Sequence, residues 1–149
     1  MQDFHRKHNR LKRYDYSSNG DYFVTMCTKE RRCLLSEIDG TGTVRLKTFG
    51  EIAVAVIKRI PDVFHGTEID RYVVMPNHIH MIVELSNDKW TLSQVINYLK
   101  GNISREIGDH IWQRSFYDHV IRDERDYYRI LEYLEMNPRR WAKDKYYME

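Results

Sequence analysis

The chain of 149 residues is long enough for one compact domain and too short for two comfortable ones, so we predict a single domain over residues 1–149. Charged residues make up 31% and aromatic residues 13%, which is typical of a globular protein and excludes the disordered and fibrous classes. The formal net charge of +2 is mildly basic and by itself decides nothing about binding partners.

The cysteines and the apolar runs bear on where the protein works. Cys27 and Cys33 form no Cys-x-x-Cys pair, which fits a reducing compartment and argues against a disulfide scaffold or a thiolate zinc site. Residues 1–18 lack the apolar core of a signal peptide. The longest purely apolar run, residues 52–57, is far shorter than the roughly 20 residues that cross a bilayer. We therefore expect a cytoplasmic protein that does not enter a membrane.

Residues 1–18 are predicted to form a basic N-terminal arm. No acidic residue interrupts its cationic cluster, which consists of Arg6, Lys7, Arg10, Lys12 and Arg13. Such a cluster is suited to contacts with the phosphates of DNA. A solvated tail without a partner is the alternative interpretation.

The first half of the chain predicts one strand and one helix. Residues 22–28 are aromatic and β-branched and follow the Asn19-Gly20 turn signal, so they predict a strand. Residues 40–42 mark a loop. From residue 47 to residue 59 apolar side chains recur at helical spacing, and Pro61 ends this first predicted helix.

The second half predicts a hairpin, a helix, a strand and a last helix. Two apolar runs at residues 67–75 and 78–85 meet at Pro76-Asn77 and predict an antiparallel hairpin. The capping box Thr91-x-x-Gln94 opens a helix with one continuous apolar stripe up to Ile107. The remaining elements are a strand over residues 111–121 and a helix from Asp123 to about Asn137, where Pro138 prevents continuation. The order β-α-β-β-α-β-α predicts an α+β fold, a ferredoxin-like split βαβ antiparallel sheet with an added C-terminal helix.

The second strand of the predicted hairpin carries a His-x-His pair. Side chains alternate across a strand, so His78 and His80 point to one face and the apolar positions 79, 81, 83 and 85 to the other. Two neighbouring imidazoles are half of a metal site. Half-exposed polar positions without a metal are the alternative.

The last predicted helix carries two further candidate site residues, Tyr133 and Asn137. At about 100° per residue, Tyr133 and Asn137 share one flank of this helix, beside its apolar stripe. The chain holds 11 tyrosines, and Tyr117, Tyr127 and Tyr128 compete with Tyr133, although packing with the hydroxyl at the rim explains each of them.

Four segments resemble, in the same order, the motifs of the single-tyrosine HUH transposases, the family that includes the transposases of the smallest insertion sequences and the REP-associated tyrosine transposases. The segments are Tyr22-Phe-Val-Thr-Met-Cys-Thr-Lys-Glu-Arg31, Val73-Val-Met-Pro-Asn-His78-Ile-His80, Trp112-Gln-Arg-Ser-Phe-Tyr-Asp-His119 and Tyr133-Leu-Glu-Met-Asn137-Pro138. The resemblance extends from about Arg6 to Trp141.

The resemblance implies roles for individual residues. In this family the His-x-His pair binds a divalent cation, Mg²⁺ or Mn²⁺, which would be held here by His78 and His80. The nucleophile matches Tyr133, five residues before the Pro of the Asn-Pro step. The residue one turn further on, Asn137, matches a further metal ligand, although many relatives have Gln or His there.

The chemistry of DNA cleavage agrees with these residue types. Attack on a phosphodiester develops negative charge, which a cation held by His78 and His80 would offset. A tyrosine hydroxyl becomes a good nucleophile only after it loses its proton, and a 5′-phosphotyrosine conserves the energy of the broken bond. Rejoining therefore needs no nucleotide cofactor, and the chain contains no Walker-type glycine-rich loop.

We therefore expect a transposase that nicks and transfers single-stranded DNA and recognises hairpin DNA. The basic arm would contact phosphates and Trp112 would stack on a base, although core packing is the stronger alternative for Trp112. A homodimer, in which Tyr133 acts with the histidines of a second copy, stays open beside a monomer. Two other functions stay open: a domesticated hairpin-DNA-binding protein with little or no cleavage activity, and an RNA-binding module, which would carry aromatic residues on the sheet instead of histidines.

Overall fold

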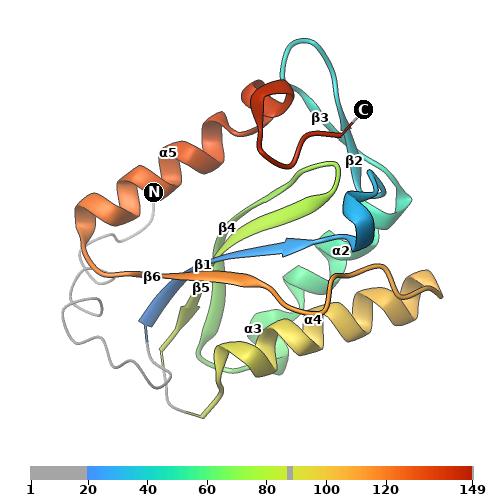
Figure 1. The fold of residues 1–149 in the computed structure, drawn as a ribbon. Helices are drawn as coiled ribbons and strands as arrows, with labels where there is room; N and C mark the ends of the chain where they lie inside the picture. The colour runs from blue at the N-terminus through green and yellow to red at the C-terminus, as the bar shows by residue number, and fades with distance from the viewer. Residues whose placement is uncertain (1–19, 87–88, 149) are drawn as a thin grey trace.

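The computed structural model describes residues 20–86 and 89–148 and consists of one four-stranded sheet with helices on both faces (Figure 1). The strands are β1 (Gly20–Cys27), β2 (Ser36–Ile38), β3 (Val44–Leu46), β4 (Thr67–Val74), β5 (His78–Leu85) and β6 (Tyr117–Ile121). The helices are η1 (Lys29–Arg31), α2 (Thr48–Lys58), α3 (Ile60–Val63), α4 (Leu92–Ile107), α5 (Glu124–Met136) and η2 (Pro138–Lys143), of which η1 and η2 are 3₁₀ segments.

The main sheet has the strand order β4-β5-β1-β6, and every neighbouring pair is antiparallel. This places β5 and β1 in the centre and connects the two β-α-β halves through α2 and α4, which is the ferredoxin-like arrangement. The predicted fold class is therefore confirmed, with α5 as the added C-terminal helix. The register pairs Thr25 with His80 and Cys27 with His78, so the two central strands bring these side chains together.

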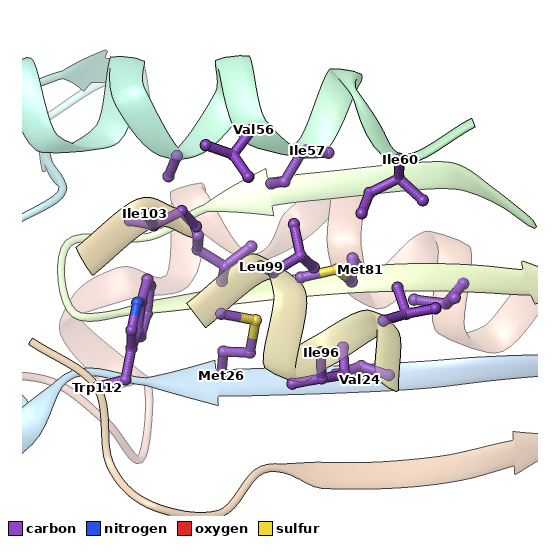
Figure 2. Packing of buried hydrophobic residues seen from close by; sticks show 14 of the residues in the cluster. Val24, Met26, Val56, Ile57, Ile60, Met81, Ile96, Leu99, Ile103 and Trp112 are labelled. Atoms are coloured by element: carbon purple, nitrogen blue, oxygen red, sulfur yellow. The ribbon is translucent and has the colours of Figure 1, made fainter. Parts of the chain in front are cut away.

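The main hydrophobic core lies between one face of the sheet and helices α2 and α4 (Figure 2). Val24 and Met26 of β1 and Met81 of β5 point into it. From the helices come Val56, Ile57, Leu99 and Ile103, all at most 2% exposed. The alternation of β5 is as predicted, because residues 79, 81, 83 and 85 all belong to this core. The histidines are thereby left for the opposite face.

Helix α5 covers part of that opposite face, where Figure 1 shows it on the far side of the sheet from α4. Tyr127, Ile130 and Leu134 form its buried stripe and pack against Ile82 and Ile121 of the sheet. Burial of each such aliphatic side chain contributes roughly 1.5–3 kcal/mol, so the stripe fixes how the helix is rotated. The side chains on its flank are consequently held at a fixed place over the sheet.

Helix ends follow the sequence signals. The Thr91 side chain accepts a hydrogen bond from the Gln94 backbone N–H and the Gln94 side chain bonds back, which is the predicted capping box. Asp123 caps α5 through the Asp126 backbone N–H at 2.8 Å. Asn137 is the C-cap of α5, as Pro138 predicted.

The prediction of a strand over residues 111–121 was wrong in its first half. The strand β6 begins only at Tyr117. The ammonium group of Lys100 donates hydrogen bonds to the backbone carbonyls of Gln113, Arg114 and Ser115 at 2.9–3.3 Å. These carbonyls are therefore satisfied by a side chain instead of by a neighbouring strand. The apolar pattern before residue 117 therefore reflects core packing.

The short hairpin β2-β3 was not predicted from the sequence, where only its loop at residues 40–42 was recognised. Both cysteines are free thiols. Within residues 20–86 and 89–148, no helix combines the length and apolar character needed to cross a membrane.

Candidate active site

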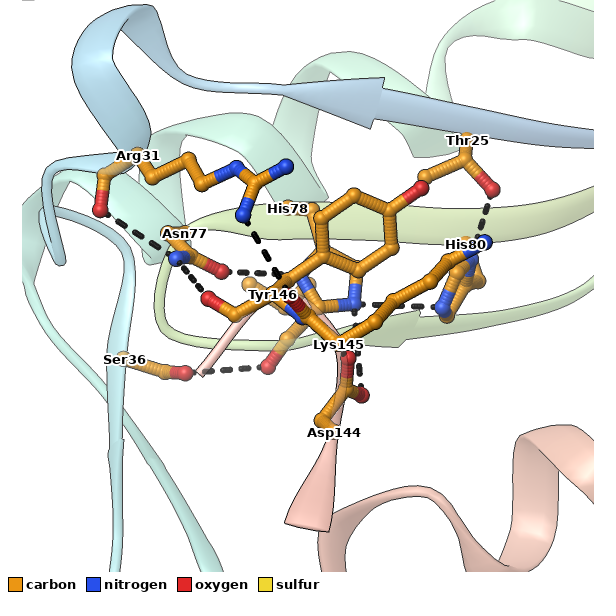
Figure 3. Close-up of polar contacts among 10 residues, drawn as sticks. Thr25, Arg31, Ser36, Asn77, His78, His80, Asp144, Lys145 and Tyr146 are labelled. Carbon is orange, nitrogen blue, oxygen red and sulfur yellow. Dashed lines mark hydrogen bonds and ion pairs between the residues drawn. The ribbon is translucent and has the colours of Figure 1, made fainter. Parts of the chain in front are cut away.

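Two buried histidines on β5 form the centre of the site. His78 and His80 are 0% and 2% exposed, and their Nε2 atoms face each other at 3.1 Å (Figure 3). The pairing that the strand period predicted is thus present, but the rings are fully buried and not half-exposed.

The outer nitrogen of each ring has its own partner. His78 Nδ1 lies 2.8 Å from Asn77 Oδ1, and His80 Nδ1 lies 2.8 Å from Thr25 Oγ1. The Asn77 amide nitrogen donates to the carbonyls of Arg31 and Tyr146, so its Oδ1 is turned toward His78 and accepts. His78 therefore carries its proton on Nδ1, and its Nε2 presents a lone pair to His80.

Both rings are held in the neutral form. The pKa of His78 is lowered to about 3, mainly by burial and to a lesser extent by the charges of Lys145 and Arg31, while the Asn137 side chain opposes the shift. The pKa of His80 is well below its usual value, because the ring is buried and lies beside His78 and Lys145. Neutral imidazoles with oriented Nδ1 atoms are the form in which histidine binds a metal ion.

Tyr133 of α5 lies over this pair. The centre of its ring is 5.4 Å from that of His80 and 6.1 Å from that of Phe23, and 41% of the residue is exposed. The phenol therefore stands between the buried imidazoles and solvent. Burial and the charge of Asp144 raise the pKa of Tyr133, whereas the Asn137 side chain lowers it.

Asn137 lies at the C-terminal end of α5, one turn beyond Tyr133, and is 4% exposed. Its side chain influences the pKa of both His78 and Tyr133 and is therefore close to each of them. No hydrogen bond of regular geometry forms at its Oδ1 with any described residue. The predicted flank of α5 thus brings Tyr133 and Asn137 to the histidines.

The C-terminal segment after α5 adds residues that the sequence analysis missed. The Tyr146 ring lies against the His78 ring, tilted by 41° with centres 4.5 Å apart, and the Tyr146 carbonyl accepts from Asn77 at 2.7 Å. Asp144 Oδ2 lies 4.0 Å from His78 Nε2, with the side chain 3% exposed. No periodic pattern marks these residues, because they follow a helix end and belong to no strand or helix, so no sequence signal could have found them.

The site opens into a cleft of about 1220 Å³ between β1, β6, α5 and the C-terminal segment. His80, Tyr133 and Asn137 line it. Four cationic side chains, Arg129, Arg140, Lys143 and Lys145, outnumber the three carboxylates of Asp118, Glu132 and Asp144 along its walls. His119 also lines the cleft and donates to the Asp126 carboxylate at 2.8 Å. The cleft therefore combines one imidazole of the buried histidine pair, a phenol and cationic side chains that are suited to binding phosphates.

Two sets of residues from the sequence analysis remain, the predicted DNA-binding residues and the competing tyrosines. Arg6, Lys7, Arg10, Lys12 and Arg13 lie outside the described residues. The prediction that Trp112 stacks on a base is contradicted by its burial: the residue is 0% exposed and belongs to the main core on the opposite face of the sheet. Of the competing tyrosines, Tyr127 is buried and donates its hydroxyl to Asp70.

The described His, Cys, Asp and Glu side chains form no close group of three that could hold a metal ion. A cation at His78 and His80 would therefore need further ligands, either an amide oxygen or a carboxylate that lies outside such a close group. Two oxygens near the histidines, Asn137 Oδ1 and Asp144 Oδ2, are buried without hydrogen-bond partners among the described residues.

Comparison with known proteins agrees with the geometry. The family model of IS200-like transposases matches residues 16–137. The chain belongs to this family. An uncharacterized protein of Haemophilus influenzae is 32% identical to this IS200-like transposase, in an alignment covering 97% of this chain and 94% of that protein. A REP-associated tyrosine transposase of Escherichia coli K12 is 28% identical and aligns over 91% of this chain and 76% of its own length.

A solved structure shares the fold of this IS200-like transposase. The structure of a REP-associated tyrosine transposase bound to a REP hairpin matches with a TM-score of 0.69 and 26% identity, covering 87% of this chain and 70% of that chain. The family model ends at Asn137. The histidines, Tyr133 and Asn137 thus lie within the part matched by the family model, whereas Asp144 and Tyr146 lie beyond it.

Proposed function

We propose that this transposase nicks single-stranded DNA beside a hairpin and transfers the cut strand through a 5′-phosphotyrosine at Tyr133. The observation that carries the proposal is that Tyr133 and Asn137, at the end of α5, meet His80 of β5 in one cleft, with His78 3.1 Å from His80. The histidine pair and the pair on the last helix are more than 50 positions apart in the chain, so their convergence is a property of the fold.

The proposal includes a divalent cation, Mg²⁺ or Mn²⁺, held by His78 and His80. Three features fit such an ion: the 3.1 Å approach of two Nε2 atoms, the Nδ1 atoms fixed by Asn77 and Thr25, and the unpartnered Asn137 Oδ1. Two lone pairs this close repel unless a cation or a proton lies between them. When bound, the ion would supply positive charge that polarises a phosphate and favours the phenolate.

Tyr133 supplies the nucleophile. Its hydroxyl, which is open to solvent, gives its proton to water. A bond then forms from Oη to phosphorus, the bond from phosphorus to the 3′ oxygen breaks, and that oxygen takes up a proton from water. Asn137 favours the ionised phenol and Asp144 opposes it. A strand end with a free 3′ hydroxyl then attacks the same phosphorus and releases the tyrosine.

The cleft supports single-stranded DNA as the substrate. Arg129, Arg140, Lys143 and Lys145 line it and would bind backbone phosphates around the reacting one. Hairpin recognition is proposed from the solved relative that is bound to a REP hairpin. The N-terminal cluster from Arg6 to Arg13 is proposed as a second phosphate contact.

The test is a covalent adduct with end-labelled oligonucleotides that carry a hairpin next to a single-stranded segment, incubated with Mg²⁺ or Mn²⁺. Wild type and Tyr128→Phe are expected to form the adduct and Tyr133→Phe to form none. Tyr128 is the matched control, because it lies on the same helix and is 47% exposed, compared with 41% for Tyr133. An adduct in Tyr133→Phe would refute the assignment, and tight hairpin binding without any adduct would favour a binding protein without cleavage activity.

A further inference from the structure

We propose that Asp144 provides an oxygen ligand to the cation at His78 and His80, so that the C-terminal segment is a working part of the catalytic centre. The inference rests on the proposed function, because it assumes that the histidines bind a divalent cation. It goes further by assigning a carboxylate that lies beyond the part matched by the family model, residues 16–137.

The two oxygens of Asp144 have different surroundings. Oδ1 accepts a hydrogen bond from the Tyr146 backbone N–H at 2.8 Å, which fixes the plane of the carboxylate. Oδ2 is buried, has no hydrogen-bond partner in the described part of the chain, and lies 4.0 Å from His78 Nε2 (Figure 3). A buried carboxylate oxygen without a donor is costly unless a cation satisfies it.

His78 does not satisfy this oxygen by itself. Its proton is on Nδ1, which donates to Asn77, so Nε2 turns a lone pair toward the carboxylate. At 4.0 Å the two atoms are also too far apart for a hydrogen bond. An acceptor thus faces an acceptor at this contact.

The separations agree with the size of a small divalent ion. Mg²⁺ binds its ligands at about 2.1 Å in octahedral geometry, so neighbouring ligand atoms are about 3.0 Å apart and opposite ones about 4.2 Å apart. The His78 and His80 nitrogens, 3.1 Å apart, match neighbouring positions. His78 Nε2 and Asp144 Oδ2, 4.0 Å apart, are closer to the spacing of opposite positions than to that of neighbouring ones, although the three groups form no close cluster among the described residues.

The C-terminal segment is anchored so that Asp144 stays at this place. Asn77, which orients His78, also donates to the Tyr146 carbonyl at 2.7 Å. Arg31 donates to the Lys145 carbonyl at 3.3 Å, and its guanidinium lies 5.4 Å from the centre of the Tyr146 ring. The Asp144 backbone N–H donates to Trp141 in η2 at 2.9 Å. The same contacts therefore hold the His78 ring and the carboxylate.

A carboxylate at this place would also select the ion. Two imidazoles and an amide suit zinc and other nitrogen-preferring metals, whereas carboxylate oxygens suit Mg²⁺ and Mn²⁺. Asp144 would shift the preference of the site toward the second group.

The experiment is a titration of the purified full chain with Mn²⁺, followed by the electron paramagnetic resonance signal of the free ion, and a parallel titration with Zn²⁺ by calorimetry. In Asp144→Asn the side-chain carbonyl can still accept from the Tyr146 N–H. This variant is expected to bind Mn²⁺ about tenfold more weakly and to lose less affinity for Zn²⁺. Asp144→Glu keeps the carboxylate and is expected to stay within about threefold of wild type in its Mn²⁺ to Zn²⁺ preference. Asp109→Asn is the charge-matched control, because Asp109 is exposed and follows α4 on the other face of the sheet.

Unchanged Mn²⁺ affinity in Asp144→Asn, or an equal loss for both ions, would overturn the role of Asp144. The joint variant His78→Ala and His80→Ala separates this result from a failure of the proposed function. If wild type binds Mn²⁺ and the double variant does not, the histidine site stands whatever Asp144 does. If wild type and the double variant bind Mn²⁺ alike, the cation site of the proposed function is itself wrong.

Discussion

Lowering the pH from 7 to 5 without divalent cations is expected to destabilise the protein through His78. The pKa of this ring is lowered to about 3 by burial, whereas an imidazole in the unfolded chain titrates near 6.5. Between these two values the unfolded state binds the proton and the folded state does not, so the free energy of unfolding falls as the pH falls.

The size of the effect follows from the two pKa values. At pH 5 the unfolded ring is about 1.5 pH units below its pKa and the folded ring is still neutral, which corresponds to a loss of about 2 kcal/mol. His80 has its pKa shifted in the same direction and adds to the loss. A loss of this size is a large part of the 5–15 kcal/mol by which domains are typically stable.

The assay is urea unfolding at both pH values in the presence of a chelator. His78→Gln removes the titrating group, so this variant is expected to lose about 2 kcal/mol less than wild type between pH 7 and pH 5. A constant destabilisation by the substitution cancels in this difference. His110→Gln is the control, because His110 is exposed, and it should behave as wild type does. His80→Gln serves the same purpose if His78→Gln does not fold. Equal losses in wild type and in both site variants would refute the view that the pair is buried in the neutral form.

Three further predictions concern single residues. Trp112→Ala should lower the free energy of unfolding by about 3–5 kcal/mol, because the side chain fills the main core. Trp112→Phe should leave the affinity for hairpin DNA unchanged. A loss of affinity in a stable Trp112→Phe protein would contradict the burial of Trp112. The pKa of Tyr133 should lie above the usual 10. In a near-ultraviolet absorbance titration, the difference between wild type and Tyr133→Phe should therefore show one phenol that ionises at higher pH than a free tyrosine. Asp144→Asn should move this ionisation to lower pH, because the carboxylate raises the pKa. Gly108→Ala should lower the free energy of unfolding by about 1 kcal/mol, because Gly108 ends α4 with a left-handed φ of 84°. A Cβ there would meet no atom within 4 Å, so the loss should come from the backbone conformation alone. An unchanged free energy in urea unfolding would contradict this conformation.

The strand and helix periods predicted the centre of the site, because each of its elements has one buried face. Met81 and its neighbours must enter the main core, which turns His78 and His80 to the other face. Likewise Ile130 and Leu134 fix the rotation of α5, which turns Tyr133 and Asn137 toward the histidines. In both cases a local pattern determines the direction of a polar side chain.

Tertiary contacts without a local pattern were not predictable. Thr25 meets His80 only because β1 and β5 pair in one particular register. Asp144 and Tyr146 reach His78 because the chain after Pro138 turns back over the sheet, and no periodicity encodes that turn. Trp112 shows a different error: the apolar pattern around it was interpreted as a strand, and of the two roles considered for the side chain, base stacking and core packing, the structure shows core packing.

The most direct test of the central claim is to identify the amino acid that carries the DNA. After reaction of wild type with a hairpin oligonucleotide and Mn²⁺, nuclease and protease digestion followed by mass spectrometry should find the nucleotide remnant on the peptide that contains Tyr133, joined through its phenol oxygen. The joint substitution of His78 and His80 by alanine should abolish this peptide. A remnant on another residue, or an undiminished yield without the two histidines, would contradict the account.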